Sequence, residues 1–479
     1  MEGDVAPAQG TGEPGGAERQ TTGPGTGTGP GTTPPDPQAL LRSKSYLRLL
    51  VIAALLGVPI SAIAYGFLEL AGYLQRELFT HLPNGLGFHG EPPWWPLPML
   101  AAAGLITGPV IRFLPGAGGP SPADGFKLHG PPGATELPGI ILAALATLAL
   151  GVVLGPEAPL IILGSGLAVL AVRLTRRDMP ARATAMVAAA GSFAAISTLF
   201  GSPILGAFLL METAGLGGPM LGLVLVPGLL ASGVGALIFL GLDAWTGLGT
   251  FSLSVPNLPH FARPDIAELG WAVVIGVAAA VVGTAIRRLA LVIRPYVEKR
   301  VIVLTPVIGL IVAGLAIAYA EGTGKSSSDV LFSGQSGLDP LVSHAASYSA
   351  GALVLLLACK GLAYGASLSS FRGGPVFPAI YLGAAGGIAL SHLPGLPMVA
   401  GMAAGIGAMS VSMLGLPLTS VLLATVLLAS DGIAVTPLVI VAVVVAYVSS
   451  ARLGPAPAAK QDPPDPAPPA AGPNTPAAG

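Results

Sequence analysis

Charged residues are scarce in this chain. Only 9% of its 479 residues are Asp, Glu, Lys or Arg, and 22 basic against 23 acidic side chains leave a net charge of −1. Soluble domains carry about 25% charged residues, so the composition excludes an ordinary soluble protein, and the balanced charge gives no indication of a nucleic-acid partner. Hydrophobic residues make up 52% of the chain and the mean hydropathy is +0.77. These values predict a polytopic membrane protein.

Residues that serve most metal, redox and hydrolytic chemistry are also few. The single cysteine, Cys359, has no partner for an intrachain disulfide, and the six histidines show no HxxxH spacing. No Ser/His/Asp series or HExxH motif lies on the apolar segments, so we expect the protein to bind no cofactor and to have no enzymatic activity. The segment Gly322-Thr-Gly-Lys-Ser326 is similar to a phosphate loop, but Tyr319 stands where the first glycine belongs, and nucleotide binding is not expected.

Large apolar residues are nearly missing from both ends of the chain. Residues 1–40 are rich in Pro, Gly and Thr and lack the apolar core of a signal peptide, and residues 454–479 are rich in Pro and Ala. We predict that both tails are disordered and that residues 41–453 form the membrane domain. Arg42, Lys44 and Arg48 precede the first long apolar segment, which predicts a cytoplasmic N-terminus in the cell membrane.

Apolar segments of uneven length fill the membrane domain. A helix rises about 1.5 Å per residue, so several segments are too short to cross the ~30 Å of hydrocarbon. Short segments interrupted by Gly and Pro are typical of transporters, whose half-helices end at a site in the middle of the membrane. The segments are 46–74, 96–114, 137–154, 159–175, 183–200, 203–214, 219–242, 268–292, 301–320, 347–366, 377–391, 397–414, 417–430 and 433–450.

An internal repeat links the two parts of this domain. Residues 191–206 match residues 405–420 at a constant offset, with Gly, Ala, Gly and Pro recurring at 191/405, 194/408, 201/415 and 203/417. In each copy the Gly-x-Pro is predicted to end one helix and begin the next. The repeat predicts an inverted-repeat transporter with halves at about 46–242 and 268–450 and its site between them.

One acidic residue lies inside an interrupted apolar run. Glu157 is the single charge between Leu137 and Val172, within Gly155-Pro-Glu-Ala-Pro159. A carboxylate in the membrane is costly and usually functional, and irregular backbone is tolerated there only beside protein or a watery cavity. Glu157 opens a helix, so it lies near free N–H groups that also suit an anion. We predict that it gates an anion site; the alternative is a purely structural contact.

Two further segments could complete this site. Gly374-Pro-Val-Phe-Pro378 holds the corresponding place in the second half and would direct a second helix N-terminus at the same point. Its alternative is a plain Gly-Pro turn. The loop 115–124 offers the hydroxyl of Ser121 as a donor, although such clusters are mostly ordinary loops.

These segments resemble the CLC family of chloride channels and chloride/proton antiporters. Residues 155–159 are similar to the family's GREGP, 374–378 to GxFxP, 117–121 to the loop leading into GSGIP, and 194–212 to AxFNAPLAGxxFxxE. The resemblance covers about 45–450. It implies an all-α fold of tilted and broken helices, a homodimer in membrane lipid with one anion pathway per subunit, and Glu157 as the gating glutamate. It also implies that backbone amides hold chloride or a similar small anion. No paired CBS domains follow the membrane part, so nucleotide binding through them is not expected.

The departures from the family pattern concern the anion ligands. Pro156 and Pro375 have no N–H, so Ala158, Val376 and Phe377 are the donors that remain. A charge-assisted hydrogen bond contributes about 1.5–3 kcal/mol, and losing two would weaken the site by several kcal/mol. The coordinating serine of the family has either become Pro120 or moved to Ser121.

Two other family positions also differ. The last-helix tyrosine of the family has no clear counterpart here, because the chain becomes Pro-rich soon after Tyr447. Proton-coupled members place a glutamate directly after the position of Glu212, where this chain has Thr213. Threonine does not relay a proton by ionising, which favours passive conduction. Chloride/proton exchange and a degenerate, non-conducting membrane protein remain as alternatives.

Overall fold

A computed structural model shows a molecule built of helices. It describes residues 41–175, 180–197, 199–200, 202–215, 219–247, 258–261, 263–428 and 432–454. The tails predicted to be disordered lie outside these residues, except for Gly454, and so does Gly201 of the repeat. Within the described ranges the one extended pairing is an isolated bridge between Gly155 and Gly374. The predicted all-α fold is confirmed.

The helices fall into two successive sets. The first set is α2 (Lys44–Arg76), the π-helical turn η1 (Glu77–His81), α3 (Leu82–Gly85), α4 (Pro96–Phe113), the 3₁₀ turns η2 (Pro115–Gly118) and η3 (Pro122–Asp124), α5 (Leu137–Ala149), α6 (Glu157–Thr175), α7 (Ala181–Ile196), α8 (Pro203–Thr213) and α9 (Pro219–Thr246). The second set is α10 (Ile266–Lys299), α11 (Val301–Thr323), η4 (Ser327–Asp329), α12 (Leu338–Ser343), η5 (Ala345–Ser347), α13 (Ala350–Ser370), α14 (Val376–Leu390), α15 (Met398–Leu414), α16 (Pro417–Leu427) and α17 (Gly432–Leu453).

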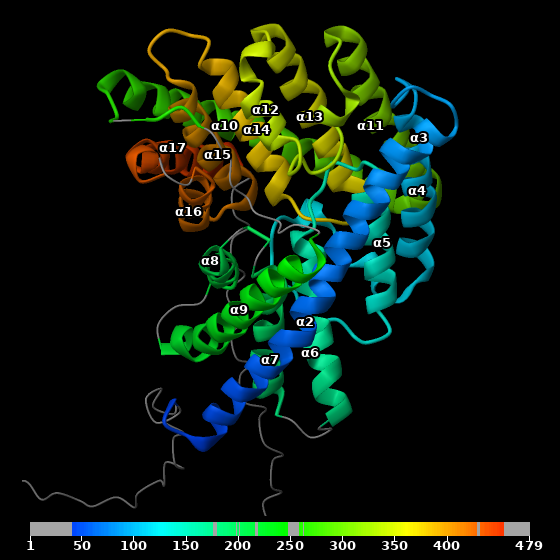
Figure 1. Cartoon of the computed structure of the whole chain (residues 1–479), viewed down its shortest axis with the longest axis vertical. Helices are drawn as coiled ribbons and strands as arrows, with labels where there is room; N and C mark the ends of the chain where they lie inside the picture. Colours follow the sequence, from blue (N-terminus) through cyan, green and yellow to red (C-terminus); the bar gives the residue numbers. More distant parts are fainter. Residues whose placement is uncertain are drawn as a thin grey trace, which may run out of the picture.

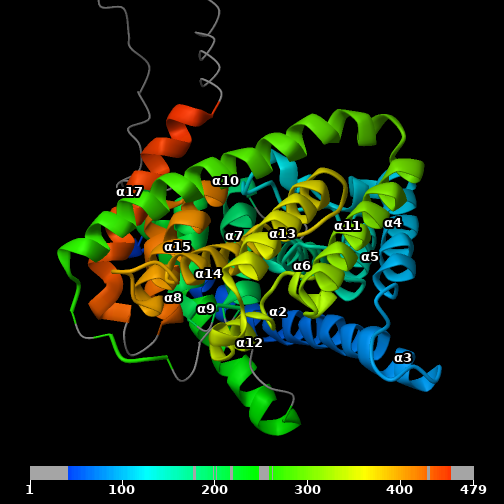
Figure 2. The same ribbon diagram turned by 90° about the horizontal axis from the view of Figure 1, so that it is seen from above.

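The two sets form two units that meet along one boundary. In Figure 1, α10 to α17 occupy the upper part and α2 with α5 to α9 the lower part. Contacts between α4 and α11 and between α8 and α16 join them. Figure 2 shows α10 running across the molecule with α17 beside it. The helices follow one another in the same order in both units, so that α6, α7 and α8 correspond to α14, α15 and α16.

Glycines allow the corresponding helix pairs to pack closely. α6 packs on α7 where Gly164 faces Gly191, and α14 packs on α15 where Gly383 faces Gly405. A Cβ added to any of the four would overlap the backbone of its partner. Small residues of this kind bring membrane helices into direct backbone contact, which holds the first helix of each pair firmly in place.

The repeated Gly-x-Pro behaves as predicted in one copy and differently in the other. Gly415 ends α15 with a left-handed φ of 71°, and Pro417 begins α16. In the first copy Pro203 begins α8, but α7 already ends at Ile196. There the hydroxyl of Ser197 donates to a carbonyl three residues earlier at 2.9 Å, closing a tight turn. The predicted helix end in this copy is therefore wrong.

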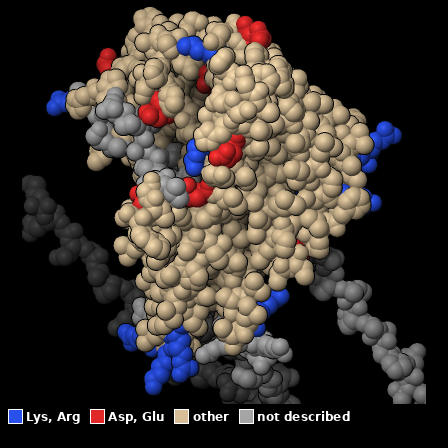
Figure 3. Space-filling view, turned by 45° about the vertical axis from the view of Figure 1, so that its right-hand side comes forward, with Lys and Arg blue, Asp and Glu red and all other residues tan. Residues whose placement is uncertain are grey.

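The lengths of the helices are mixed, as the sequence predicts. Eight of the described helices are long and apolar enough to cross a membrane, and six shorter apolar helices accompany them. Figure 3 shows that charged side chains gather in a few small groups and that most of the visible face carries none. The short helices include α14, which with the longer α6 positions the candidate site.

Candidate anion site

The two broken segments recognised in the sequence meet at one point. Gly155 and Gly374 exchange two backbone hydrogen bonds, each with an N···O distance of 2.7 Å. α6 begins at Glu157 and α14 at Val376, each two residues beyond its glycine. The N-termini of both helices therefore converge, which an anion site between half-helices requires.

The carboxylate of Glu157 lies at this meeting point and is fully buried. Its Oε1 accepts a hydrogen bond from the N–H of Val376, whereas its Oε2 has no hydrogen-bond partner among the described residues. A Cβ added to Gly155 or Gly374 would overlap the carboxyl group. Both glycines are thus needed for close approach, and the carboxylate fills the space where an anion would meet the Val376 N–H.

The start of α14 supplies the surroundings of this carboxylate. The backbone N–H of Val376, the first residue of α14, is the donor that its Oε1 contacts. The ring of Phe377 stacks on Phe200, with centroids 5.6 Å apart and planes inclined by 20°. Phe200 belongs to the segment between α7 and α8, so the stacked rings join the two units beside the site. Their burial keeps water away from the carboxylate, which strengthens its interaction with the amides.

The two prolines occupy matching positions directly before these helices. The carbonyl of Pro156 accepts from Leu160 N–H of its own helix at 3.0 Å. The carbonyl of Pro375 accepts from the Tyr364 hydroxyl of α13 at 2.6 Å. Neither proline has an N–H to offer an anion. Pro378 and Pro159 follow in the first turn of each helix, so the pattern Gly-Pro-x-x-Pro occurs in both units.

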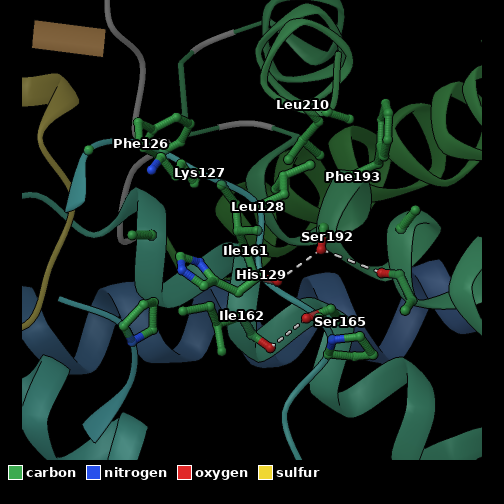
Figure 4. Close-up of a pocket in the computed structure, with 18 of the residues that line it drawn as sticks. Phe126, Lys127, Leu128, His129, Ile161, Ile162, Ser165, Ser192, Phe193 and Leu210 are labelled. Atoms are coloured by element: carbon green, nitrogen blue, oxygen red, sulfur yellow. Dashed lines mark hydrogen bonds between the residues drawn. The ribbon is translucent and has the colours of Figure 1, made fainter. Parts of the chain in front are cut away.

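A partly open cavity of about 320 Å³ reaches the helix starts from outside. Ser121, Ala158 and Pro375 line it together, so the structure brings these three predicted residues into one space. Figure 4 shows Lys127 and His129 on the loop that precedes α5, at the same cavity. Two serine hydroxyls of its wall donate to carbonyls of α6, at 2.9 and 3.0 Å. The cavity therefore reaches the first turn of α6 and the residue before α14.

The family's proton-relay position lies at the end of α8 near this cavity. The Thr213 hydroxyl donates to the Leu209 carbonyl of its own helix at 2.5 Å, while Leu210 and Ala214 line the cavity. The neighbouring Glu212 points to the other unit. Its carboxylate accepts from the N–H of Leu418 and from the N–H and hydroxyl of Thr419, at 2.9, 2.7 and 2.6 Å. Glu212 therefore caps the N-terminus of α16.

Sequence reasoning missed two buried polar residues of α13. Lys360 is fully buried, and its ammonium donates to the carbonyls of Asp329, Val330 and Leu331 at 3.0 Å each and to that of Phe332 at 3.4 Å. It is a lone charge in an apolar segment, so the reasoning that identified Glu157 would have found it. Tyr364 is fully buried as well. A tyrosine in a membrane helix carries no such signal.

The last-helix tyrosine remains without a counterpart at the site. Tyr447 lies on α17 with 44% of its surface exposed. Its side chain is therefore not enclosed as the carboxylate of Glu157 is.

The amino-acid sequence of this chain is similar to those of known proteins. The family profile described as "Voltage gated chloride channel" matches residues 99–451. YfeO, a protein of Escherichia coli O1:K1 named for ion transport, is 31% identical over 366 residues, which cover 74% of this chain and 82% of YfeO. YfeO of Escherichia coli strain K12 / DH10B matches to the same extent. The chain belongs to the CLC family.

Solved structures share the fold of this CLC chain. A slow cyanobacterial Cl⁻/H⁺ antiporter aligns with a TM-score of 0.65 at 17% identity, covering 86% of this chain and 96% of that one. A CLC-type fluoride/proton antiporter aligns with a TM-score of 0.58 at 20% identity, covering 84% and 95%. A eukaryotic CLC transporter aligns with a TM-score of 0.62 at 17% identity, covering 85% and 72%. This CLC chain is an integral membrane protein of a family that transports anions.

Proposed function

We propose that this CLC chain conducts chloride or a similar small anion passively, through a pathway between its two units that Glu157 gates. The observation that carries the proposal is the hydrogen bond from the Val376 N–H to a buried carboxylate at two converging helix N-termini. A negative group already occupies the place that suits an anion. When the side chain swings aside or takes up a proton, a dissolved anion replaces it on the same donors.

The donors of the proposed site are the amides of Ala158, Val376 and Phe377, with Ser121 at its cavity side. The sequence motifs Gly155-Pro156 and Gly374-Pro375 leave two positions without N–H groups. Each missing charge-assisted hydrogen bond weakens anion binding by about 1.5–3 kcal/mol. Weak binding allows an ion to leave quickly, and fast release favours conduction.

Passive movement is favoured by the absence of an ionisable group at Thr213. Its hydroxyl is bonded within α8, and the carboxylate of Glu212 is held by three donors at the start of α16. We therefore expect no proton route inward from Glu157 through these two residues.

Chloride/proton exchange is the second candidate, and one observation favours it. The Oε2 of Glu157 is buried without a hydrogen-bond partner among the described residues, and a proton on that oxygen would remove the cost of a buried charge. Proton uptake by the gate is the first step that coupled exchange needs. A degenerate protein that no longer conducts is the third reading, supported by the two prolines.

Liposomes distinguish the three readings. Chloride efflux and proton movement are measured for the wild type, for Glu157→Ala and for the surface control Glu298→Ala, whose side chain is 58% exposed. We expect efflux from the wild type without proton movement, faster efflux from Glu157→Ala, and no change for Glu298→Ala. Proton movement coupled to chloride would establish exchange. Efflux no faster than from empty liposomes in both the wild type and Glu157→Ala would establish the degenerate reading.

The assembly around this site belongs to the same proposal. We place the transport domain at residues 41–453, with its halves at about 46–242 and 268–450 and with tails on either side. The protein acts as a homodimer in the cell membrane, with its N-terminus in the cytoplasm, where Arg42, Lys44 and Arg48 lie before the first span. Crosslinking in native membranes and accessibility of a cysteine introduced at residue 42 test both statements.

A further inference from the structure

The hydroxyl of Tyr364 makes a hydrogen bond to the backbone of the candidate site from behind. Tyr364 lies on α13, is fully buried, and donates to the Pro375 carbonyl at 2.6 Å. Pro375 is the residue before Val376, whose N–H holds the gate carboxylate.

The Pro375 carbonyl and the Val376 N–H belong to the same peptide group. A peptide group is planar and trans, so its C=O and its N–H point in opposite directions. The Tyr364 hydroxyl and the Glu157 carboxylate therefore lie at opposite ends of one rigid unit. A rotation of this unit would turn its carbonyl towards the anion and its N–H away.

A hydrogen bond at one end of a peptide group also changes the other end. Donation to the carbonyl polarises the amide, which makes its N–H a stronger donor. The effect is large where water is excluded, and Val376, Phe377 and Tyr364 are all fully or almost fully buried.

The two units differ at this position. In the first unit the carbonyl of Pro156 accepts from Leu160 N–H, a backbone bond within α6. In the second unit a side chain from another helix bonds the carbonyl of Pro375. The carbonyl end of the Pro375–Val376 peptide is therefore held by a contact from another helix, whereas the corresponding carbonyl of the first unit is held within its own helix.

We propose that Tyr364 is a positioning residue of the anion site: its hydroxyl holds the Pro375–Val376 peptide so that the Val376 N–H points at the bound anion. Tyr364 touches no anion itself. The proposal rests on the proposed function, because the anion it concerns is the one that replaces the Glu157 carboxylate.

Chloride binding to the purified protein in detergent, measured by isothermal titration, tests this role without relying on transport. The background is Glu157→Ala, in which the Val376 N–H is free for chloride. Tyr364→Phe removes only the hydroxyl, and we expect it to weaken chloride binding about fivefold, the value of a hydrogen bond of about 1 kcal/mol.

Tyr381→Phe in the same background is the matched control. Tyr381 is a buried tyrosine on α14, and its hydroxyl has no hydrogen-bond partner among the described residues. Removing it should leave chloride affinity unchanged. Thermal denaturation of all variants checks that each is folded, and a merely structural role of Tyr364 would lower the melting temperature without changing affinity in the folded fraction.

The outcomes separate the two proposals. Weaker binding in Tyr364→Phe with unchanged binding in Tyr381→Phe supports the positioning role. Equal chloride affinity with and without the Tyr364 hydroxyl overturns it and leaves the anion site standing. An absence of chloride binding in Glu157→Ala itself overturns the anion site and, with it, the role of Tyr364.

Discussion

Glu157 and Lys360 are both fully buried ionisable side chains in membrane helices, yet their surroundings are opposite. The ammonium of Lys360 donates to four successive backbone carbonyls and lies 4.4 Å from the centroid of the Tyr381 ring. One carboxylate oxygen of Glu157 accepts from one N–H, and the other has no partner in the described part of the chain. A buried charge with all its hydrogen bonds made is stabilised where it lies, whereas a buried carboxylate oxygen without a partner costs free energy.

The two residues also differ in what they hold together. Lys360 fixes the carbonyls of residues 329–332, a loop whose Phe332 N–H donates to the Gly151 carbonyl at 3.1 Å, just before the first broken segment. Glu157 bridges α6 and α14 through its bond to the Val376 N–H. In the proposed function an anion replaces this bond, so that Lys360 supports the site and Glu157 works in it. Four substitutions test this contrast by their effect on the free energy of unfolding.

Lys360→Met has the largest expected effect. It leaves four buried carbonyls without their donor, and removing one partner of a buried charged group costs about 3–5 kcal/mol. The melting temperature in detergent should fall strongly. Lys325→Met is the matched control, because Lys325 also bonds a neighbour, Ser347, at 3.0 Å and lies 4.3 Å from the centroid of a tyrosine ring, but near the surface. Equal melting temperatures for the two variants would refute the anchoring role of Lys360.

Gly374→Ala should come next, at about 2 kcal/mol, because its new methyl group overlaps the Glu157 carboxyl group. In a Glu157→Ala background the same change should cost almost nothing, since the overlapping atoms are gone. Gly386→Ala on α14 is the control, because the nearest atom to its added Cβ is 3.9 Å away. An unchanged cost of Gly374→Ala in the Glu157→Ala background would show that the glycine serves another purpose.

Asp329→Asn should destabilise the protein by about 1 kcal/mol. The carboxylate of Asp329 accepts from the hydroxyls of Tyr319 and Tyr348 at 3.0 Å each, beside the carbonyls that bind Lys360. Asparagine keeps an acceptor but loses the charge. Asp339→Asn should have no measurable effect in thermal denaturation, because Asp339 is exposed and accepts from one hydroxyl, that of Ser343. An unchanged melting temperature for Asp329→Asn would show that Lys360 stabilises this loop without help from the Asp329 carboxylate.

Glu157→Gln should change stability least, by less than about 0.5 kcal/mol, because glutamine keeps the oxygen that accepts from Val376 and removes a buried charge. Chloride efflux from liposomes should nevertheless rise about tenfold, which corresponds to a shift of about 1.4 kcal/mol in the free-energy difference between the closed and open states. Glu298→Gln is the surface control for both measurements. If Glu157→Gln lowered the melting temperature as far as Lys360→Met, both residues would be structural and the contrast would fail.

The features that could be predicted are those that depend on neighbours in the chain. Low charge and high hydropathy predict membrane helices whatever their packing, and Gly-Pro pairs interrupt a helix wherever they occur. Glu157 is conspicuous because its apolar neighbours in the sequence make its charge costly. The exception is the end of α7, where Ser197 closes a turn before the predicted glycine, because a side-chain bond to the backbone competes with the helix.

The sequence by itself determined that the protein lies in a membrane, is built of helices in a repeated order and carries a carboxylate at a helix start. Only the tertiary structure decided that this carboxylate meets the N–H of Val376, 219 residues further on. It also decided that the Tyr364 hydroxyl bonds the other end of that peptide group. The ammonium of Lys360 makes all its hydrogen bonds, whereas one oxygen of Glu157 has no partner in the described part of the chain. Hydrogen bonds between distant segments depend on how the helices pack. The residues next to Tyr364 or Lys360 in the sequence do not indicate which distant backbone groups these side chains will contact.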